Sequence, residues 1–306
     1  MVAIETTIRI GSNEIIAETK VGTRDMKFTL VSDLHIDHYR DNQQIDWHVV
    51  HRWARADILV IAGNVSDSFH CTMEEILLAR QAFRHVVFVD GPCEHYSDYG
   101  APHASDELQR FAEQHDGIHY IGDGPGILID HTLVCGIAGW HSLHWGTNRQ
   151  QPRENCQGRP WDRHDAGGMR CGSPVYPDVL PAQRFEPLAQ RVRDAAVDQT
   201  IHEIVIVTNM VPHADAVTFA GDHIRDLEME AACTAALMPI WSDCLDGGKL
   251  TTWCFGRSRG SQDFMDNGVR FISNPRGHAG ETRDAPYTVR LIDTSAVIDE
   301  SFEAWA

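Results

Sequence analysis

Five short groups of polar residues could carry chemistry in this chain, and each follows an apolar stretch of strand length. They supply carboxylates, imidazoles, amides and guanidiniums, which are groups that bind metal ions or anions in proteins. Because parallel strands bring their carboxyl ends to one edge of a sheet, we expect the five groups to form a single site. The groups are Asp33 with His35, Asn64 with Asp67, Glu94 with His95, Asn209 with His213, and Arg257 with Arg259.

The elements that must position these groups alternate between apolar strands and amphipathic helices, which is typical of a layered α/β fold with parallel strand pairs. The predicted strands are 27–32, 57–62, 85–89, 118–121, 127–129, 132–137, 203–208, 252–255, 269–273 and 288–292. The predicted helices are 47–55, 73–83, 105–114, 183–197 and 226–237.

Two segments depart from this alternation. Residues 1–25 hold the turn sequence Gly11-Ser12-Asn13 between two β-prone runs, which predicts an N-terminal β-hairpin extension. Residues 26–306 are expected to form one domain, interrupted at about 146–181 by a long loop insertion rich in Gly, Pro, Arg, Asn and Gln. Its composition suits both a partner-binding loop and a disordered one.

The order of the polar groups resembles that of the calcineurin-like metallophosphoesterase family. That family carries Asp-x-His, Gly-Asp, Gly-Asn-His-Glu/Asp, a single His and Gly-His-x-His, each after a strand. The resemblance covers about 26–292 and implies two packed mixed β-sheets flanked by helices, a four-layer αββα sandwich. The matching stretches are Asp33-Leu34-His35, Gly63-Asn64, Gly91-Pro92-Cys93-Glu94, Asn209 and Gly256-Arg257-Ser258-Arg259, and Gly136–Trp145 and Gly268–Glu281 resemble two further family segments.

The resemblance implies a pair of divalent metal ions, but most of the matching ligand positions carry other residues here. Asp33 and His35 remain, as at most a vestigial site for one divalent transition metal (Mn, Fe, Ni or Zn); otherwise we expect no cofactor. Proline has no side-chain donor atom, protonated arginine cannot ligate, and hard ions need the charge of the bridging carboxylate. The replaced positions are Asn64, Pro92, Asn209, Arg257 and Arg259.

The position that matches the family's general acid, a histidine, is Cys93. His95 could serve instead only if its loop shifted. For Glu94 and His95 we expect roles in loop structure rather than catalysis. His141 and His144 could form a surface metal pair, and hydrogen-bonded loop histidines are the alternative.

Two arginines, Arg257 and Arg259, stand on the loop where the family places metal-binding histidines. We expect their guanidiniums to occupy the space of the lost ions, with one pairing bidentately with Asp33. Such a pair would remove the cost of a buried, uncompensated carboxylate. Two roles for the arginines stay open. They could form a structural salt bridge that fills the former site, or the second arginine could bind a phosphate or carboxylate.

Composition narrows the possible partners and location. The net charge is −18, from 26 Lys and Arg against 44 Asp and Glu, which argues against broad nucleic-acid binding. Eight cysteines without C-x-x-C spacing predict reduced, mostly buried thiols. The apolar runs are too short for a membrane span, and the N-terminus lacks a signal-peptide pattern. We therefore expect a cytoplasmic protein, in which 18 histidines make a metal site worth seeking.

Three functional hypotheses follow. The first is a pseudoenzyme with an arginine-filled former metal site, acting as a binding or structural component whose protein partner docks on the N-terminal hairpin or the 146–181 insertion. The second is an active phosphoesterase with one metal at Asp33 and His35, completed by Asn64, Asn209 or a shifted His95. The third is a metal-free protein that binds a phosphate-bearing small ligand.

Overall fold

A computed structural model describes most of the predicted strands and helices of the chain. The described residues are 4–10, 13–19, 26–40, 43–95, 101–122, 126–138, 180–213, 216, 248–258, 260–279 and 287–295. The predicted helix 226–237, the histidines His141 and His144, and Arg259 lie outside them. So does the predicted insertion, except for its last two residues, which begin a helix.

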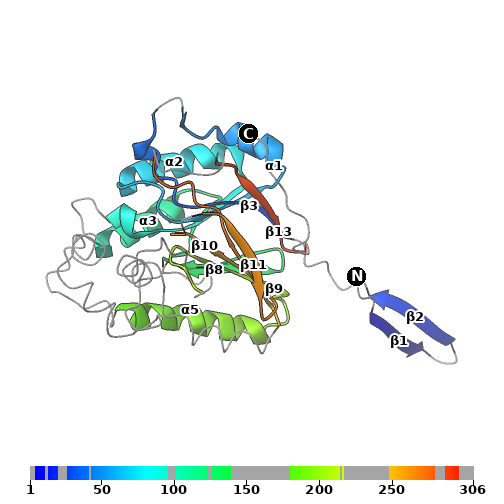
Figure 1. Cartoon of the computed structure of the whole chain (residues 1–306). Helices are drawn as coiled ribbons and strands as arrows, with labels where there is room; N and C mark the ends of the chain where they lie inside the picture. The colour runs from blue at the N-terminus through cyan, green and yellow to red at the C-terminus, as the bar shows by residue number, and fades with distance from the viewer. Residues whose placement is uncertain are drawn as a thin grey trace.

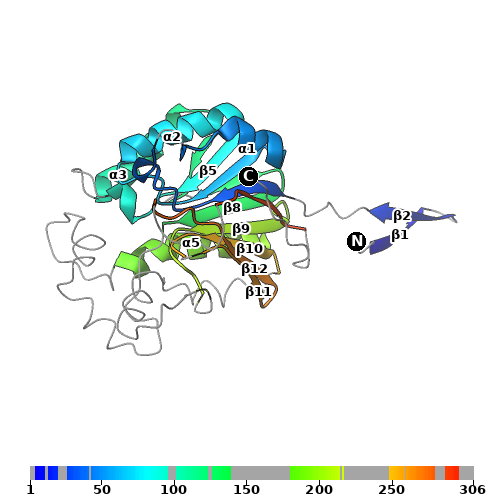
Figure 2. The ribbon, with the colours of Figure 1, turned by 45° about the horizontal axis from the view of Figure 1, so that its top comes forward.

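Two mixed β-sheets pack face to face (Figures 1 and 2). The five-stranded sheet has the order β13-β3-β4-β5-β6 and the six-stranded sheet the order β11-β12-β10-β9-β8-β7. Strands β3 to β6 are parallel to one another, as are β8, β9, β10 and β12, while β13, β7 and β11 are antiparallel additions. The first sheet contains β3 (Lys27–Val31), β4 (Ile58–Ala62), β5 (His85–Val89), β6 (Ile118–Tyr120) and β13 (Arg290–Asp293). The second contains β7 (Ile127–Ile129), β8 (Thr132–Ile137), β9 (Glu203–Thr208), β10 (Leu250–Phe255), β11 (Gln262–Asp266) and β12 (Val269–Ser273).

Helices cover both outer faces of this pair of sheets. Helices α1 (Trp47–Ala54), α2 (Phe69–Ala82) and α3 (Ala101–Gln114) lie over the first sheet, and α5 (Leu180–Val197) lies over the second (Figure 2). Three apolar clusters fill the spaces between these layers, and the middle one joins the two sheets. The four-layer αββα sandwich expected from the sequence is therefore confirmed.

The central strands form because apolar, mostly β-branched runs can be buried on both faces. Every residue of β4 and β9 is buried, as parallel strands covered on both faces require. Helix α1 begins where the Asp46 carboxylate accepts a 3.0 Å hydrogen bond from the Val49 backbone N–H, and it ends at Arg55 in the left-handed conformation.

Most predicted element boundaries in the described residues coincide with those of the structure, and the others differ by one to four residues. Helix α2 begins at Phe69 rather than 73, and α5 begins at Leu180 rather than 183. Strand β11 was not predicted, because its sequence QDFMD is largely polar and is only half-buried at the sheet edge. The short 3-10 helices η1 (Ile36–His38) and η3 (Pro92–His95) were also missed.

The N-terminal strands β1 (Ile4–Ile10) and β2 (Asn13–Thr19) pair only with each other. They form an antiparallel hairpin that lies beside the sandwich in Figure 1. No helix in the described part of the chain is long and apolar enough to cross a bilayer.

Gly136 on β8 allows the two sheets to approach, and this generates a stability prediction. A Cβ atom there would lie 2.3 Å from the Val207 carbonyl oxygen and 3.1 Å from both Ile121 and Val89 across the sheet interface. Gly136→Ala should lower the free energy of unfolding by about 1–3 kcal/mol through overpacking. Urea denaturation measures this, with Gly260→Ala as the control because no atom lies within 4 Å of its added methyl group. Equal stabilities of the two variants would contradict the prediction.

Candidate functional site

The loops that follow β3, β4, β5, β9 and β10 meet at one rim of the sandwich, as the sequence predicted. The Asp33 backbone N–H donates to the Gly63 carbonyl at 2.9 Å, and the His35 N–H donates to the Asn64 carbonyl at 3.2 Å. The Gly256 N–H donates to the Asn209 carbonyl at 3.1 Å, which joins the loops of β9 and β10. Backbone hydrogen bonds therefore hold the site loops to one another.

Asp33 is the central buried carboxylate of this rim, with 5% of its surface exposed. Its Oδ1 accepts a 2.8 Å hydrogen bond from Asn64 Nδ2, and its Oδ2 accepts a 2.9 Å hydrogen bond from the Arg257 backbone N–H. Burial raises the pKa of Asp33, while the Asn64 amide and Arg257 oppose this effect. The sequence predicted a bidentate guanidinium partner for Asp33; the structure shows an amide side chain and a backbone N–H donating to it.

The two asparagines are held in place by further hydrogen bonds. Asn64 Oδ1 accepts a 3.2 Å hydrogen bond from the Cys93 backbone N–H, so this amide links Asp33 to the loop after β5. Asn209 Nδ2 donates to the Ala62 carbonyl at 2.7 Å. Among the described residues, no donor reaches Asn209 Oδ1, although the residue is fully buried.

Three glycines close tightly around these side chains. A Cβ atom on Gly63 would lie 2.7 Å from Asn209 Nδ2, and one on Gly91 would lie 2.2 Å from Asn64 Oδ1. A Cβ atom on Gly256 would lie 3.0 Å from Asp33 Oδ2. The backbone therefore packs directly against the amides and the carboxylate.

Four non-glycine residues of the site adopt positive φ angles, namely Asp33 (49°), His35 (43°), Asn64 (55°) and Arg257 (51°). Asp, Asn and His tolerate this conformation better than most residues do, whereas arginine is unusual there. Strained backbone of this kind clusters at functional sites and persists only when its surroundings enforce it. Here the interloop hydrogen bonds supply that enforcement.

The residues present do not fit the pair of metal ions that the family resemblance implies. The Asn64 amide donates directly to Asp33, so a neutral N–H group stands where a bridging carboxylate would hold two ions. Asn209 turns its NH₂ group to a backbone carbonyl, and Arg257 presents a backbone N–H to Asp33. The one unpartnered oxygen among these described groups, Asn209 Oδ1, cannot replace the missing ligands.

Glu94 and Cys93 have structural rather than catalytic surroundings. Glu94 is fully buried and accepts hydrogen bonds from the backbone N–H groups of Val65 (2.5 Å) and Gly91 (2.8 Å). Burial, strengthened by the charge of Glu94, raises the pKa of the Cys93 thiol well above its usual range, so the thiol stays protonated. The side chain of His95 lies outside the described part.

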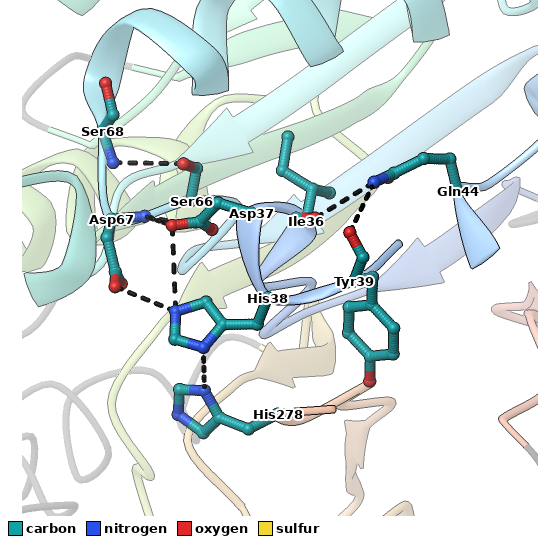
Figure 3. Close-up of polar contacts among 9 residues, drawn as sticks. All are labelled: Ile36, Asp37, His38, Tyr39, Gln44, Ser66, Asp67, Ser68 and His278. Carbon is teal, nitrogen blue, oxygen red and sulfur yellow. Dashed lines mark hydrogen bonds and ion pairs between the residues drawn. The ribbon is translucent and has the colours of Figure 1, made fainter. Parts of the chain in front are cut away.

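A cluster of histidines beside Asp33 was missed at the sequence level. The His35 ring stacks on that of His278, with 3.8 Å between ring centroids, and the His38 ring lies edge-on to His35. Burial and the neighbouring His278 lower the pKa of His35 to about 3, so this imidazole is neutral at physiological pH. Figure 3 shows His38 between His278 and the carboxylates of Asp37 and Asp67. Two features of the sequence could have indicated the cluster: the count of 18 histidines and the sequence HIDH at residues 35–38.

The segment after β12 carries His278 to this cluster. Asn274 Nδ2 donates to the Leu30 carbonyl at 3.0 Å, and the Gly277 N–H donates to the Asp33 carbonyl at 2.8 Å. The Arg276 guanidinium lies over the Tyr39 ring at 3.6 Å and donates to the Gln43 carbonyl. Two other predicted site residues also have partners. His213 Nε2 lies 3.0 Å from Asp266 Oδ2 of β11, and Asp67 Oδ2 lies 2.9 Å from Nε2 of His38 in the histidine cluster.

Glu94 generates a pH prediction. Burial raises its pKa from 4.5 to about 7 in the folded state, against the opposing pull of the two backbone N–H groups. The folded protein then binds more protons than the unfolded chain between pH 4.5 and 7, so the stability contributed by Glu94 is complete below pH 4.5 and lost as the pH rises through about 7. Between pH 4.5 and 8, wild type should lose about 3 kcal/mol of unfolding free energy relative to Glu94→Gln.

Urea denaturation at a series of pH values measures this difference. Comparison with the variant is needed because burial also raises the pKa of Glu75 and lowers that of His119, with opposite effects on the slope. Glu113→Gln, on the exposed face of α3, is the control and should run parallel to wild type. Parallel curves for Glu94→Gln and wild type would show that the prediction is wrong.

The proteins similar to this chain were found by comparing structures. No protein-family model and no curated protein sequence matches it. The phosphopantetheinyl hydrolase PptH of Mycobacterium tuberculosis is similar with a TM-score of 0.61 at 15% identity, over 92% of this chain and 99% of that one. The protein TT1561 of Thermus thermophilus gives 0.50 at 11% identity, over 82% and 89%. A dimetal phosphatase from Danio rerio gives 0.48 at 13% identity, over 81% and 86%.

At these identities the similarity shows the fold alone. What is similar is the arrangement of two mixed sheets with helices on both outer faces. The chain has the α/β fold of calcineurin-like phosphoesterases.

Proposed function

We propose that this protein is a phosphoesterase-like pseudoenzyme that acts as a binding or structural component. The observation that carries the proposal is the 2.8 Å hydrogen bond from Asn64 Nδ2 to Asp33 Oδ1. It ties up the one surviving carboxylate of the former site with a neutral donor. Two-metal hydrolysis depends on charged ligands that hold both ions and lower the pKa of a bridging water.

The remaining groups do not replace that chemistry. Cys93, at the position of the family's general acid, is a buried thiol whose burial raises its pKa, so it is a poor proton donor to a leaving group at neutral pH. The carboxylate of Glu94 binds two backbone N–H groups of its own loops. Arg257 contributes positive charge beside Asp33 and Cys93, which supports an anion-binding role as a variant of the same proposal.

The partner we propose is another protein, docking on the N-terminal hairpin or on the 146–181 insertion. Strands β1 and β2 pair with no strand of the two main sheets. An isolated two-stranded hairpin is marginally stable in water, so a binding partner would stabilise it. A cytoplasmic location fits the four free thiols among the described cysteines, Cys71, Cys93, Cys135 and Cys254.

A phosphoesterase with a single metal is the second candidate, and the histidine cluster beside Asp33 favours it. His35, His38 and His278 can place their ring nitrogens within 4.8 Å of one another. This candidate requires turnover, which separates it from the pseudoenzyme. Elemental analysis of the purified protein reports only whether an ion is present, so it must be combined with an activity assay.

The activity test uses bis-p-nitrophenyl phosphate and p-nitrophenyl phosphate with Mn²⁺, Ni²⁺, Co²⁺ or Fe²⁺. Wild type and Asp33→Asn should release nitrophenolate at the same rate, equal to the rate without protein. Asp33→Asn is nearly isosteric and removes only the negative charge of the first ligand. Metal-dependent turnover by wild type above the rate without protein would overturn the proposal and favour the second candidate. Its loss in Asp33→Asn would place the metal at Asp33, and its retention would place the metal at the histidine cluster.

A stability test addresses the carrying contact itself. Asn64→Asp would oppose two buried carboxylates and remove the N–H donor to Asp33, so in a chelator at pH 8 it should cost about 2–4 kcal/mol of unfolding free energy. The control is Asn267→Asp, because Asn267 also has a positive φ (47°) but is exposed in the turn between β11 and β12. Equal effects of the two substitutions would show that the Asn64 contact stabilises little.

A further inference from the structure

Three imidazoles and one supporting carboxylate lie together on the surface beside the former dinuclear site. His35 follows β3, His38 ends η1, and His278 follows β12. His35 is buried, with 5% exposed, and the other two rings are exposed. Only His35 is shared with the ligand positions that the family resemblance implies, so any ion held here would occupy a different place.

Asp67 fixes which nitrogen of His38 is available. His38 Nε2 lies 2.9 Å from Asp67 Oδ2, so Nε2 carries the proton and Nδ1 keeps its lone pair. The Asp67 backbone N–H lies 3.3 Å from Asp37 Oδ2, which orients the Asp67 loop (Figure 3). A carboxylate on the second nitrogen of an imidazole is the usual outer-shell arrangement of a metal-binding histidine.

The exposed rings of His38 and His278 point their Nδ1 atoms toward each other. His38 Nδ1 and His278 Nδ1 are 3.4 Å apart. Figure 3 marks this contact with a dashed line. This distance is longer than an ordinary N–H hydrogen bond, which spans about 2.7–3.2 Å. It equals the edge of a tetrahedron around an ion with metal–nitrogen bonds of about 2.1 Å, which is about 3.4 Å.

His35 supplies the third nitrogen, Nδ1. This nitrogen is buried and has no hydrogen-bond partner among the described residues. One ring nitrogen from each of the three histidines lies within 4.8 Å of the others. Rotation of the two exposed rings, with His278 leaving its stack on His35, would bring the three nitrogens around one point. A buried ring nitrogen left unpaired is costly, and coordination would satisfy it.

The backbone around the cluster is held firmly enough to serve as a scaffold. The His38 N–H donates to the His35 carbonyl at 2.9 Å, and the Gly277 N–H donates to the Asp33 carbonyl at 2.8 Å. Tyr39 Oη donates to the Gly277 carbonyl at 2.9 Å, which joins η1 to the segment that carries His278. The three ligands therefore come from two segments that are already linked.

The geometry points to a mononuclear metal site formed by His35, His38 and His278, with Asp67 as the outer-shell carboxylate. Three imidazole ligands favour Zn²⁺ and other first-row ions, which bind nitrogen, over Mg²⁺ and Ca²⁺, which bind oxygen. A tetrahedral ion with three protein ligands keeps a fourth position open. Because two of the ligands are exposed, that position can take water or an anionic group of a ligand.

The test is calorimetric titration of the chelator-treated full chain with Zn²⁺. Wild type should bind one equivalent, and binding should raise the Tm. His278→Ala and His38→Ala should weaken binding by more than about 100-fold, because loss of an outer-shell partner alone costs about 10- to 100-fold. Asp67→Asn should fall in that smaller range. His70→Ala is the control. This histidine is exposed on α2, where its neighbour is Glu74 at 3.7 Å, and it is not one of the three proposed ligands.

Co²⁺ in place of Zn²⁺ reports the ligand set. Tetrahedral coordination gives strong visible absorption, and nitrogen-only ligands give no thiolate charge-transfer band. Such a band would place the ion at Cys93 with His35 and Asp67, a neighbouring group of candidate ligands, and would overturn the three-histidine site. So would the absence of one-equivalent Zn²⁺ binding, or wild-type affinity in His278→Ala. The Asn64–Asp33 contact and the function proposed from it would stand in either case.

Discussion

The structure of this rim depends on the hydrogen bonds that one buried carboxylate accepts. Asp33 is nearly inaccessible to solvent, and a charge placed there without partners would be costly. The Asn64 amide and the Arg257 backbone N–H meet that need from two different loops, so the loops after β3, β4 and β10 must come together. Asn64 also accepts the Cys93 N–H, which extends the constraint to the loop after β5. One local electrostatic requirement thereby organises loops from both sheets.

The same contacts show how the site loops are held in an architecture shared with phosphoesterases. In a two-metal site, ions would neutralise the carboxylates and hold the loops. In this chain hydrogen bonds hold the loops, and glycines pack the backbone directly against the polar side chains. The positive φ angles of Asp33, Asn64 and Arg257 are maintained by these contacts. The rim is therefore organised by the groups that the protein itself supplies.

The histidine cluster shows a second consequence of this arrangement. The segment 274–277 is tied to β3 by Asn274 and to Asp33 by Gly277, and it delivers His278 onto His35. The meeting of the His278 ring with His35 was not anticipated from the sequence. The Asn–Pro–Arg–Gly sequence sets the course of the backbone. Which side chain His278 contacts depends on the fold, because its neighbour His38 lies 240 positions away in the sequence.

The sequence by itself determined the layers and the convergence of the loops, because buried apolar runs such as ILVIA and EIVIVT specify parallel strands whose polar carboxyl ends share an edge. It also showed that Asn64, Pro92 and Asn209 cannot serve as charged ligands, since that follows from residue type alone. Tertiary structure decided which groups donate hydrogen bonds to Asp33, because a backbone N–H carries no residue-specific signal. It also decided the meeting of His35, His38 and His278, because no local pattern records a contact made across the fold.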